Sequence, residues 1–116
     1  MLTQFGKALR KLRIDRNELL RDMAETLHVT PSYLSAIENG KRNIPEEWPD
    51  VIAEKYSLSS VEYSQLLNAA SYSKEEIRLN VKNSHNSKKE LALSFARKFD
   101  ELSEEDIQRL LAALNS

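Results

Sequence analysis

The sequence contains no cysteine, only two glycines and only two histidines among its 116 residues. Without cysteine the chain can form neither a disulfide nor a thiolate metal site. His28 and His85 are far apart and lack the spacing of paired metal ligands, so the sequence predicts no metal site and no cofactor. No apolar run is long enough to cross a membrane, and the first residues lack the apolar core of a signal peptide. We therefore expect a cytoplasmic protein without a membrane partner.

Sequence signatures of catalysis are absent as well. The chain has no glycine-rich phosphate loop, no nucleophile elbow and no pair of carboxylates with a supporting base. The acidic runs at residues 75–76 and 104–106 fit the first turns of helices, where negative charge is favourable. The sequence therefore predicts a protein that is not an enzyme.

What is present is helical periodicity, most clearly in residues 20–45, which predict two short helices joined by a tight turn. Thr30 is a favourable N-cap for the second helix, and Pro31 is favourable as its first residue because no N–H is needed there. Gly40 fits the left-handed position that ends a helix. The spacing places the following side chains on the inner faces of the two helices: Met23, Ala24, Leu27, Leu34 and Ile37.

The stretch MAETLHVTPSYLSAIENGKRNIP resembles the helix-turn-helix of the Cro/repressor (XRE) family of bacterial and phage regulators. Its SYLS-x-IE-x-GKR-x-IP spacing follows a common pattern of that family, and the likeness covers roughly the first 70 residues. The resemblance implies an all-α protein with a five-helix, lambda-repressor-like DNA-binding domain at residues 1–70. Two residues depart from the family: His28 takes the turn position where glycine is usual, and Leu20 replaces a glutamine that often anchors a phosphate. We expect His28 to adopt a left-handed backbone conformation.

The resemblance also implies which residues meet double-stranded DNA. In this fold the N-terminal half of the second helix of the motif enters the major groove. Its central positions hold no Arg, Gln or Asn for bidentate base contacts, so modest direct readout assisted by DNA shape is expected. For Tyr33, packing against the following helix or capping the turn is an alternative. The implied base-facing residues are Pro31, Ser32, Tyr33, Ser35 and Ala36.

Phosphate contacts and one structural ion pair follow from the same resemblance. Phosphate contacts fix the register of a protein on DNA without reading its sequence. Arg13 is expected to pair with Glu38 and so tie the recognition helix to the first helix. The alternative, that Glu38 reads a cytosine, is disfavoured because Glu38 follows the inward-facing Ile37. The candidate phosphate contacts are Thr30, Asn39, Lys41, Arg42 and, on the first helix, Arg10.

The distribution of charge agrees with a DNA-binding N-terminal part. The formal net charge is −1, yet residues 1–45 hold eight cations and five carboxylates, a net charge of +3, which leaves −4 for the remainder. A basic front half and an acidic back half fit a domain that meets DNA and a tail with another task. Chance scatter of charges is the alternative, since differences of this size are common in charged chains.

Further helices are predicted on both sides of the motif. Periodicity indicates a first helix at residues 3–14. The second helix ends at Leu27, and its cap is either Asp15, with Glu18 three residues later, or Asn17.

Two more helices are predicted after the motif. One covers roughly residues 46–56, and Pro49 fits it only if the helix starts late, near Trp48, or if its first turn is irregular. Ser59 and Glu62 form a capping box for the next, which runs through residue 70. The candidate core residues of these two helices are Trp48, Val51, Ile52, Tyr56, Val61, Tyr63, Leu66, Leu67 and Ala70.

Residues 71–87 are predicted to be a linker, because Ser and Asn are frequent there. Within it Ile77, Leu79 and Val81 alternate with polar residues, the period of a strand. Such a strand could pair with the same strand of a second copy across a two-fold axis. The alternatives are an extended linker that lays three apolar side chains on the first domain, or a helix that starts from Ser73 and Glu76.

Residues 88–116 are predicted to form a C-terminal helical hairpin for dimerisation or partner binding. Ser87 and Glu90 have capping-box spacing for its first helix, and Ser103 is a favourable cap for its second. The hairpin is too short to bury both of its apolar faces alone. The candidate interface residues of the linker and hairpin are Ile77, Leu79, Val81, Leu91, Phe95, Phe99 and Leu110.

Three functions are compatible with these patterns. The first is a sequence-specific DNA-binding transcriptional regulator, a homodimeric repressor whose operator has half-sites about one helical turn apart. The second is an antitoxin that binds a toxin protein through an acidic tail and autoregulates its own promoter. The third is a helical adaptor that binds no DNA, which the cations Lys41 and Arg42 weigh against.

Overall fold

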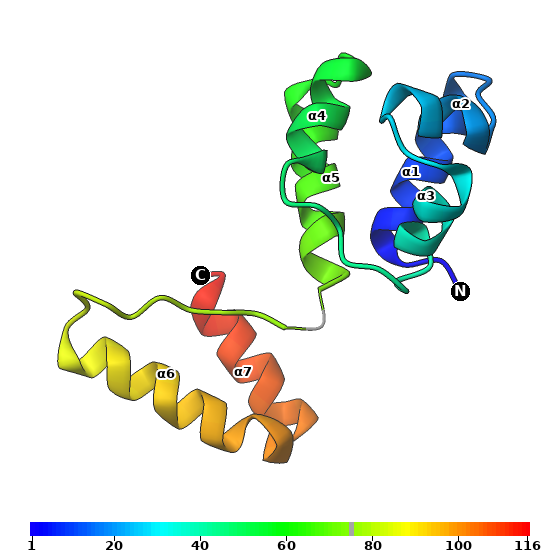
Figure 1. Ribbon diagram of the computed structural model, residues 1–116. Helices are drawn as coiled ribbons and strands as arrows, with labels where there is room; N and C mark the ends of the chain where they lie inside the picture. The colour runs from blue at the N-terminus through cyan, green and yellow to red at the C-terminus, as the bar shows by residue number, and fades with distance from the viewer. Residues whose placement is uncertain (75) are drawn as a thin grey trace. The chain divides into compact units, whose positions relative to one another are not determined.

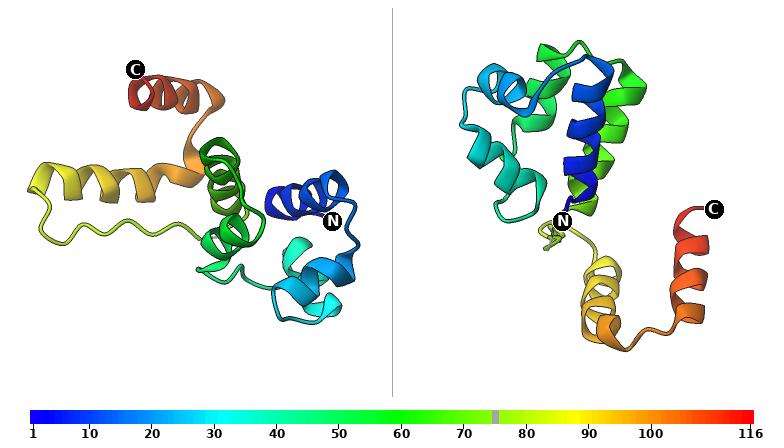
Figure 2. Two further views of the ribbon diagram at one scale, coloured as in Figure 1. Left: turned by 90° about the horizontal axis from the view of Figure 1, so that it is seen from above. Right: turned by 90° about the vertical axis from the view of Figure 1, so that its right-hand side faces the viewer.

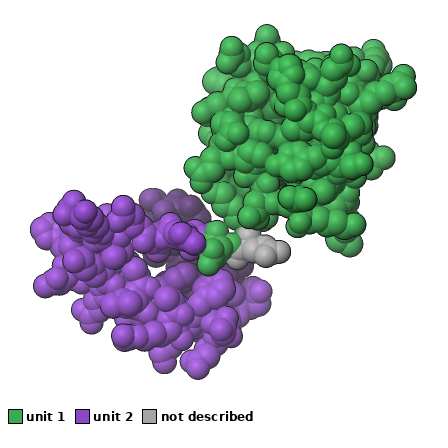
Figure 3. Space-filling model, viewed as in Figure 1, with its two compact units in different colours: residues 1–76 green, residues 77–116 purple. Residues whose placement is uncertain are grey.

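The computed structural model describes residues 1–74 and 76–116, which form two compact units (Figures 1 and 3). We call residues 1–76 the head unit and residues 77–116 the tail unit. The described residues contain helices and no strand, so the predicted all-α class is confirmed. The helices of the head unit are α1 (Gln4–Asp15), α2 (Leu20–Thr26), α3 (Pro31–Glu38), α4 (Trp48–Lys55) and α5 (Ser60–Tyr72).

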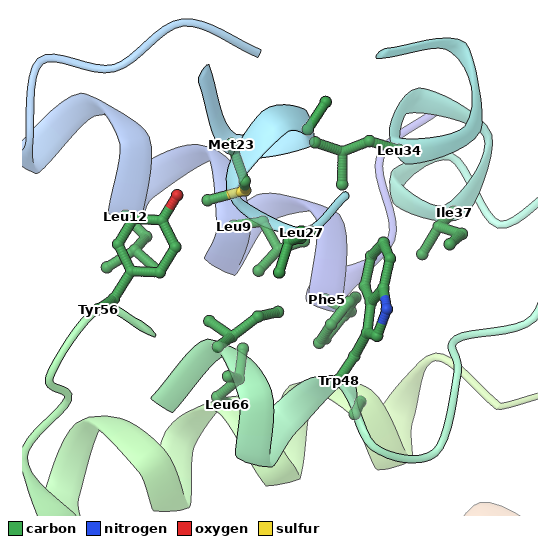
Figure 4. Close-up of a cluster of buried hydrophobic side chains, with 13 residues drawn as sticks. Phe5, Leu9, Leu12, Met23, Leu27, Leu34, Ile37, Trp48, Tyr56 and Leu66 are labelled. Atoms are coloured by element: carbon green, nitrogen blue, oxygen red, sulfur yellow. The ribbon is translucent and has the colours of Figure 1, made fainter. Parts of the chain in front are cut away.

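Helix α1 is the centre of the head unit: it packs against α2, α3 and α5, while α4 packs against α5 (Figures 1 and 2). Thr3 caps it, because its Oγ1 accepts a hydrogen bond of 3.0 Å from the N–H of Gly6. Apolar residues of all five helices and of their ends meet in one core (Figure 4). The buried members are Phe5, Leu9, Leu12, Met23, Ala24, Leu27, Leu34, Ile37, Trp48, Ile52, Tyr56, Leu66 and Ala70.

The predicted caps of α2 are wrong, and that of α5 is confirmed. Asp15 is the last residue of α1, and Asn17 follows with a left-handed φ of 56°, a conformation that Asn tolerates, so the chain turns there. Helix α2 begins only at Leu20, and the Asp22 carboxylate accepts the Leu19 N–H at 2.8 Å. At α5 the Ser59 capping box is formed as predicted.

Two predicted core residues of α5 are exposed. Val61 is 64% exposed and Leu67 39% exposed, whereas Leu66 and Ala70 are buried. Residues four apart share one face of a helix, and α5 turns only the Leu66–Ala70 face toward α1 and α4. The prediction for Val61 and Leu67 is therefore wrong, because their apolar character does not place them on that face.

The tail unit begins with residues 77–82, which form neither a strand nor a helix in the chain as described. The predicted strand is thus not formed within one chain, where its backbone groups would have no strand to pair with. A helix starting at Ser73 is also wrong, because Ser73 is the C-cap of α5; residue 75 lies outside the described residues. Ile77 and Leu79 are 79% and 68% exposed.

Helices α6 (Asn86–Lys98) and α7 (Glu104–Leu114) complete the tail unit, joined by a 3-10 turn at Phe99–Glu101. His85 is the N-cap of α6 and makes no side-chain capping bond, so the predicted Ser87 cap is wrong: Ser87 already lies inside the first turn. Ser103 caps α7 as predicted, with Oγ 3.1 Å from the N–H of Asp106. The two helices run in broadly opposite directions but diverge, and neither buries a side chain (Figures 1 and 2).

Within the described part of the chain, no helix has the length and apolar character needed to span a membrane.

Candidate nucleic-acid interface

Helices α2 and α3 form a crossed pair joined by a turn at His28 (Figure 1). His28 has a φ of 58°, so the expected left-handed conformation is confirmed. The turn is closed by a hydrogen bond of 2.9 Å from the Val29 N–H to the Ala24 carbonyl. Ala24 is 1% exposed, and its small side chain allows the two helices to approach closely.

The first turn of α3 begins as the sequence predicts. The Oγ1 of Thr30 accepts the Tyr33 N–H at 3.1 Å, and Pro31 is the first residue of the helix. Because the Thr30 oxygen acts as an acceptor in this cap, its hydroxyl hydrogen remains able to donate to a phosphate. Thr30, Pro31 and Ser32 are all exposed.

The outward face of α3 borders an open depression of about 360 Å³. It lies on the side opposite Leu34 and Ile37, which are buried in the core. Leu20, the residue in place of the usual glutamine, is partly buried against the core and adds an apolar wall to the depression. The residues that line it are Leu20, Pro31, Ser32, Ser35, Ala36, Asn39 and Lys41.

Tyr33 is the one predicted base-facing residue that does not line this depression. Its ring meets the ring of Trp48 edge-on, with centroids 6.2 Å apart and planes at 81°. The Arg42 guanidinium lies 5.8 Å from the centroid of the Tyr33 ring, within the range of a cation–π contact. The Tyr33 ring therefore packs against the helix that follows α3, which is the alternative to a base contact. The ring also holds Arg42 beside α3.

The C-terminal end of α3 uses its own backbone donors. Gly40 has a φ of 73°; its N–H donates to Ile37 and the Lys41 N–H donates to Ala36, at 3.1 and 2.8 Å. The Asn39 side-chain amide donates to the Ser35 carbonyl at 2.9 Å. The backbone N–H groups of residues 39–41 are therefore already donated to carbonyls of α3, which leaves the side chains of this segment to contact phosphates. The side chains of Lys41 and Arg42 are exposed.

Glu38 is bound by α1 through both its side chain and its backbone. Its carboxylate forms a two-pronged contact with Arg13, with Nη1–Oε2 at 2.5 Å and Nη2–Oε1 at 3.1 Å. Both residues are buried, so this pair is the one the resemblance implies, and Glu38 has no access to a base. The carbonyl oxygen of Glu38 also accepts the N–H and the hydroxyl of Thr3, at 2.9 and 3.1 Å.

Arg10 lies on the exposed side of α1 nearest to α3. Gly6 and Arg13 both contact Glu38. Arg10 lies four residues after Gly6 and three residues before Arg13, so it is on the same side of the helix. Lys11, its neighbour in the sequence, borders a groove between α1 and α5 together with Glu62. The two cations therefore face different sides of the head unit, and only Arg10 is on the α3 side.

No sequence pattern indicates one cluster of contacts that lies beside the helix-turn-helix. The Arg16 guanidinium donates to the carbonyl of Tyr56 at 2.7 Å and lies 5.4 Å from the centroid of its ring. The Tyr56 hydroxyl donates to Glu18 at 2.7 Å. Burial, and then the hydrogen bond to Glu18, raise the pKa of Tyr56 to about 12. These contacts fix the loop before α2 on the end of α4, and they join residues some 40 positions apart, beyond the reach of local patterns.

Among the described residues, no group of three His, Cys, Asp or Glu side chains is placed to hold a metal ion.

Comparison with known proteins gives one family and two relatives. The family described as "Helix-turn-helix domain" matches residues 6–70. The HTH-type transcriptional repressor RghR of Bacillus subtilis (strain 168) is 32% identical over 74 residues, which are 64% of this chain and 53% of that protein. The uncharacterized HTH-type transcriptional regulator RghRB of the same organism is 34% identical over 80 residues, 66% of this chain and 56% of that protein. The chain thus spans about half the length of these relatives. No solved structure matches it.

Proposed function

Because the chain belongs to the helix-turn-helix domain family, and within it to the Cro/repressor (XRE) type, we propose that it is a sequence-specific, double-stranded DNA-binding transcriptional regulator of the cytoplasm. We propose further that it is a homodimeric repressor and places α3 in the major groove. The observation that carries the proposal is the outward face of α3, which is followed directly by the two exposed cations Lys41 and Arg42.

In this proposal the bases meet small side chains. Ser32 and Ser35 donate to or accept from base edges, and Pro31 and Ala36 contact thymine methyl groups. Tyr33 contacts the DNA only at the edge of this surface, because its ring also packs against Trp48. A surface of this kind discriminates weakly among bases, so the deformability of the operator adds to the selectivity.

The phosphates on either side are held by Thr30, Lys41, Arg42 and Arg10. Arg42 is directed by its contact with the Tyr33 ring, and Arg10 lies on the α3 side of α1. Asn39 donates one amide N–H to the Ser35 carbonyl, and its second amide N–H can still donate to a phosphate. Arg13 and Glu38 contact no DNA in this scheme and fix the orientation of α3.

Dimerisation follows from the size of this surface. One head unit offers only a few cations to the phosphates, and each phosphate contact adds a limited, salt-dependent increment of affinity. Two head units linked by their tails bind two half-sites with a much higher combined affinity. The tail unit, with its exposed apolar residues, is the proposed link.

The antitoxin alternative loses the charge argument that favoured it. The acidic excess of the back half lies in residues 46–76, with seven carboxylates and two cations, whereas residues 77–116 hold six carboxylates and seven cations. The tail unit therefore has no acidic excess, which weakens the argument that it holds a basic partner. We propose no catalytic role.

The dependence of DNA affinity on salt tests the proposed interface. Replacing Lys41 or Arg42 by Ala should weaken binding to all duplexes and lower the slope of log affinity against log salt by about one for each phosphate that the variant no longer binds. Lys11→Ala is the matched control, because Lys11 faces the α1–α5 groove and its removal should leave the slope unchanged. Equal slopes for all three variants and the unaltered protein would contradict the assignment of α3 and its flank as the DNA-binding surface.

A further inference from the structure

The ends of the two helices of the tail unit differ in charge, although α6 also holds Glu90 and α7 also holds Arg109. Cations occupy both ends of α6: Lys88 and Lys89 in its first turn, and Arg97 and Lys98 in its last. Three carboxylates, at residues 104–106, occupy the first turn of α7. One helix is therefore basic at both ends and the other is acidic at its start.

The start of α6 is electrostatically unfavourable by itself. The first turn of a helix carries the positive end of the helix dipole, which favours anions and disfavours cations. Helix α6 nevertheless has Lys88 and Lys89 there, no acidic residue, and an N-cap, His85, without a side-chain hydrogen bond. Carboxylates from elsewhere, close to this turn, would remove the penalty.

The start of α7 has more negative charge than its cap requires. Asp106 alone forms the capping box with Ser103, and it also pairs with Arg109 at 2.5 Å, a contact that lowers its pKa. Glu104 and Glu105 take no part in that box. They are available to a basic partner.

Each of the two helices also has an exposed apolar face. On α6 and at the start of the 3-10 turn that follows it, Leu91, Phe95 and Phe99 recur at intervals of four, and the centroids of the two Phe rings lie 5.5 Å apart. Leu91 is 66% exposed and Phe99 59%. The apolar stripe of α7 comprises Ile107, Leu110, Leu111 and Leu114. Contiguous exposed faces of this kind mark surfaces that another protein covers.

We propose that a second copy of this chain covers these faces, in a two-fold four-helix bundle in which each α6 lies between its own α7 and the α7 of the other copy. In a bundle with a two-fold axis across it, equivalent helices are antiparallel. Since α6 and α7 of one chain run in broadly opposite directions, α6 is parallel to α7 of the other copy. Their N-terminal ends are then neighbours, so Lys88 and Lys89 meet Glu104 and Glu105 of the second copy.

The charge pattern selects this pairing over the others. If α6 packed antiparallel against α6 of the second copy, Lys88 and Lys89 would lie beside Arg97 and Lys98, and the like charges would repel. With the proposed arrangement, the cations at the C-terminal end of α6 lie near the acidic start of their own α7, and those at the N-terminal end near the acidic start of the other. All four cationic positions then have carboxylates nearby.

Charge reversal in the full-length chain tests the pairing, with mass measured by light scattering. The unaltered protein should have twice the 13.3 kDa of one chain. Lys88→Glu with Lys89→Glu, and separately Glu104→Lys with Glu105→Lys, should each weaken self-association at least about tenfold, because both copies then present like charges. An equimolar mixture of the two variants should restore the dimer as a mixed species, since both contacts between the N-terminal ends of α6 and α7 of different copies again join opposite charges. Lys82→Glu, outside both helices, is the control and should change nothing.

The lysine reversal also separates failure of pairing from failure of folding. Glu in the first turn of α6 favours the helix, so helix content by circular dichroism should be kept while self-association is weakened. A monomeric unaltered chain at 100 μM, or a variant mixture that does not form the mixed dimer, would overturn the proposal. A stronger association of the lysine-reversed variant by itself would do so too, because it would indicate contact between the two α6 helices.

This inference rests on the homodimeric part of the proposed function and not on DNA binding itself. Binding of the monomeric variants to a random duplex at low salt distinguishes the two. Binding of these variants to the random duplex should persist, because Lys41 and Arg42 are unchanged. If the unaltered protein itself does not bind the random duplex, the DNA-binding proposal fails instead.

Discussion

Gly6 of α1 lies so close to Glu38 that a Cβ at position 6 would stand 2.2 Å from the Glu38 carbonyl oxygen. That oxygen already accepts two hydrogen bonds from Thr3. The end of α3 is therefore held against the first turn of α1 by its backbone, in addition to the Arg13 contact of its side chain. Glycine at position 6 is required by this close approach.

Gly6→Ala should destabilise the head unit by about 1–3 kcal/mol, because the added methyl group forces α1 and α3 apart. The sign of the change in unfolding free energy is informative, since Ala is the better helix former by about 1 kcal/mol and would stabilise an unobstructed helix. Urea unfolding of the variant measures the change, with Lys7→Ala at the next, exposed position as the control. A Gly6→Ala protein as stable as the unaltered one would show that the two helices are not in this contact.

The Arg13–Glu38 pair should show strong coupling. Glu38→Ala leaves a buried guanidinium without its partner and should cost about 3–5 kcal/mol of unfolding free energy. Arg13→Met combined with Glu38→Leu removes both charges and should cost much less than the two single changes added together. Denaturant unfolding of the two single variants and the double variant measures this. Strictly additive losses would mean that the two side chains act independently.

His28→Gly should stabilise the protein. Residues other than glycine pay about 1–2 kcal/mol for a left-handed backbone, and glycine avoids this at the expense of greater freedom in the unfolded chain. A net gain of about 0.5–1 kcal/mol is expected, measured by thermal or urea unfolding. His28→Ala keeps the strain and should bring no gain, so equal behaviour of the two variants would rule out the explanation.

Stability should fall at high pH through Tyr56. Its folded-state pKa is raised from 10.0 to about 12, first by burial and then by its bond to Glu18, so the folded state holds the phenolic proton more tightly than the unfolded state. The resulting stabilisation is complete below pH 10 and is lost as the pH rises from 10 toward 12. It is on the order of 1 kcal/mol after allowance for solvent screening. Tyr56→Phe should be less stable than the unaltered protein near neutral pH but lose less on going to strongly alkaline pH; parallel pH curves would contradict this role of Tyr56.

Local chemistry made much of the head unit predictable. Thr30, Pro31 and Gly40 each occupy the position for which their backbone or side chain is suited, and the Ser59–Glu62 spacing is realised as a capping box. The same spacing at Ser87–Glu90 gave a wrong prediction of the start of α6, because the N-cap of α6 is His85, two residues earlier. Capping-box spacing indicates a possible start, and the backbone conformation of the preceding residues decides whether it is used.

Contacts between distant residues were not predictable from patterns. The Arg16–Tyr56 contact and the packing of Tyr33 on Trp48 depend on how α4 meets the rest of the head unit. The exposure of Val61 likewise follows from which face of α5 meets α1 and α4, and apolar character alone does not fix that face. In the candidate site, the resemblance supplied the residues, while the structure revealed that the backbone N–H donors of residues 39–41 are already engaged.

Selection of duplexes from a random library by the purified full-length chain tests DNA readout by α3 most directly. We expect enrichment of one sequence with two-fold symmetric half-sites, centred about one helical turn, or roughly 10–10.5 base pairs, apart. Ser32→Ala combined with Ser35→Ala changes only the outward face of α3, and it should reduce the enrichment while leaving non-specific binding intact. A library with no enriched sequence, or the same sequence enriched to the same degree by the double variant, would contradict the proposal that α3 reads the operator.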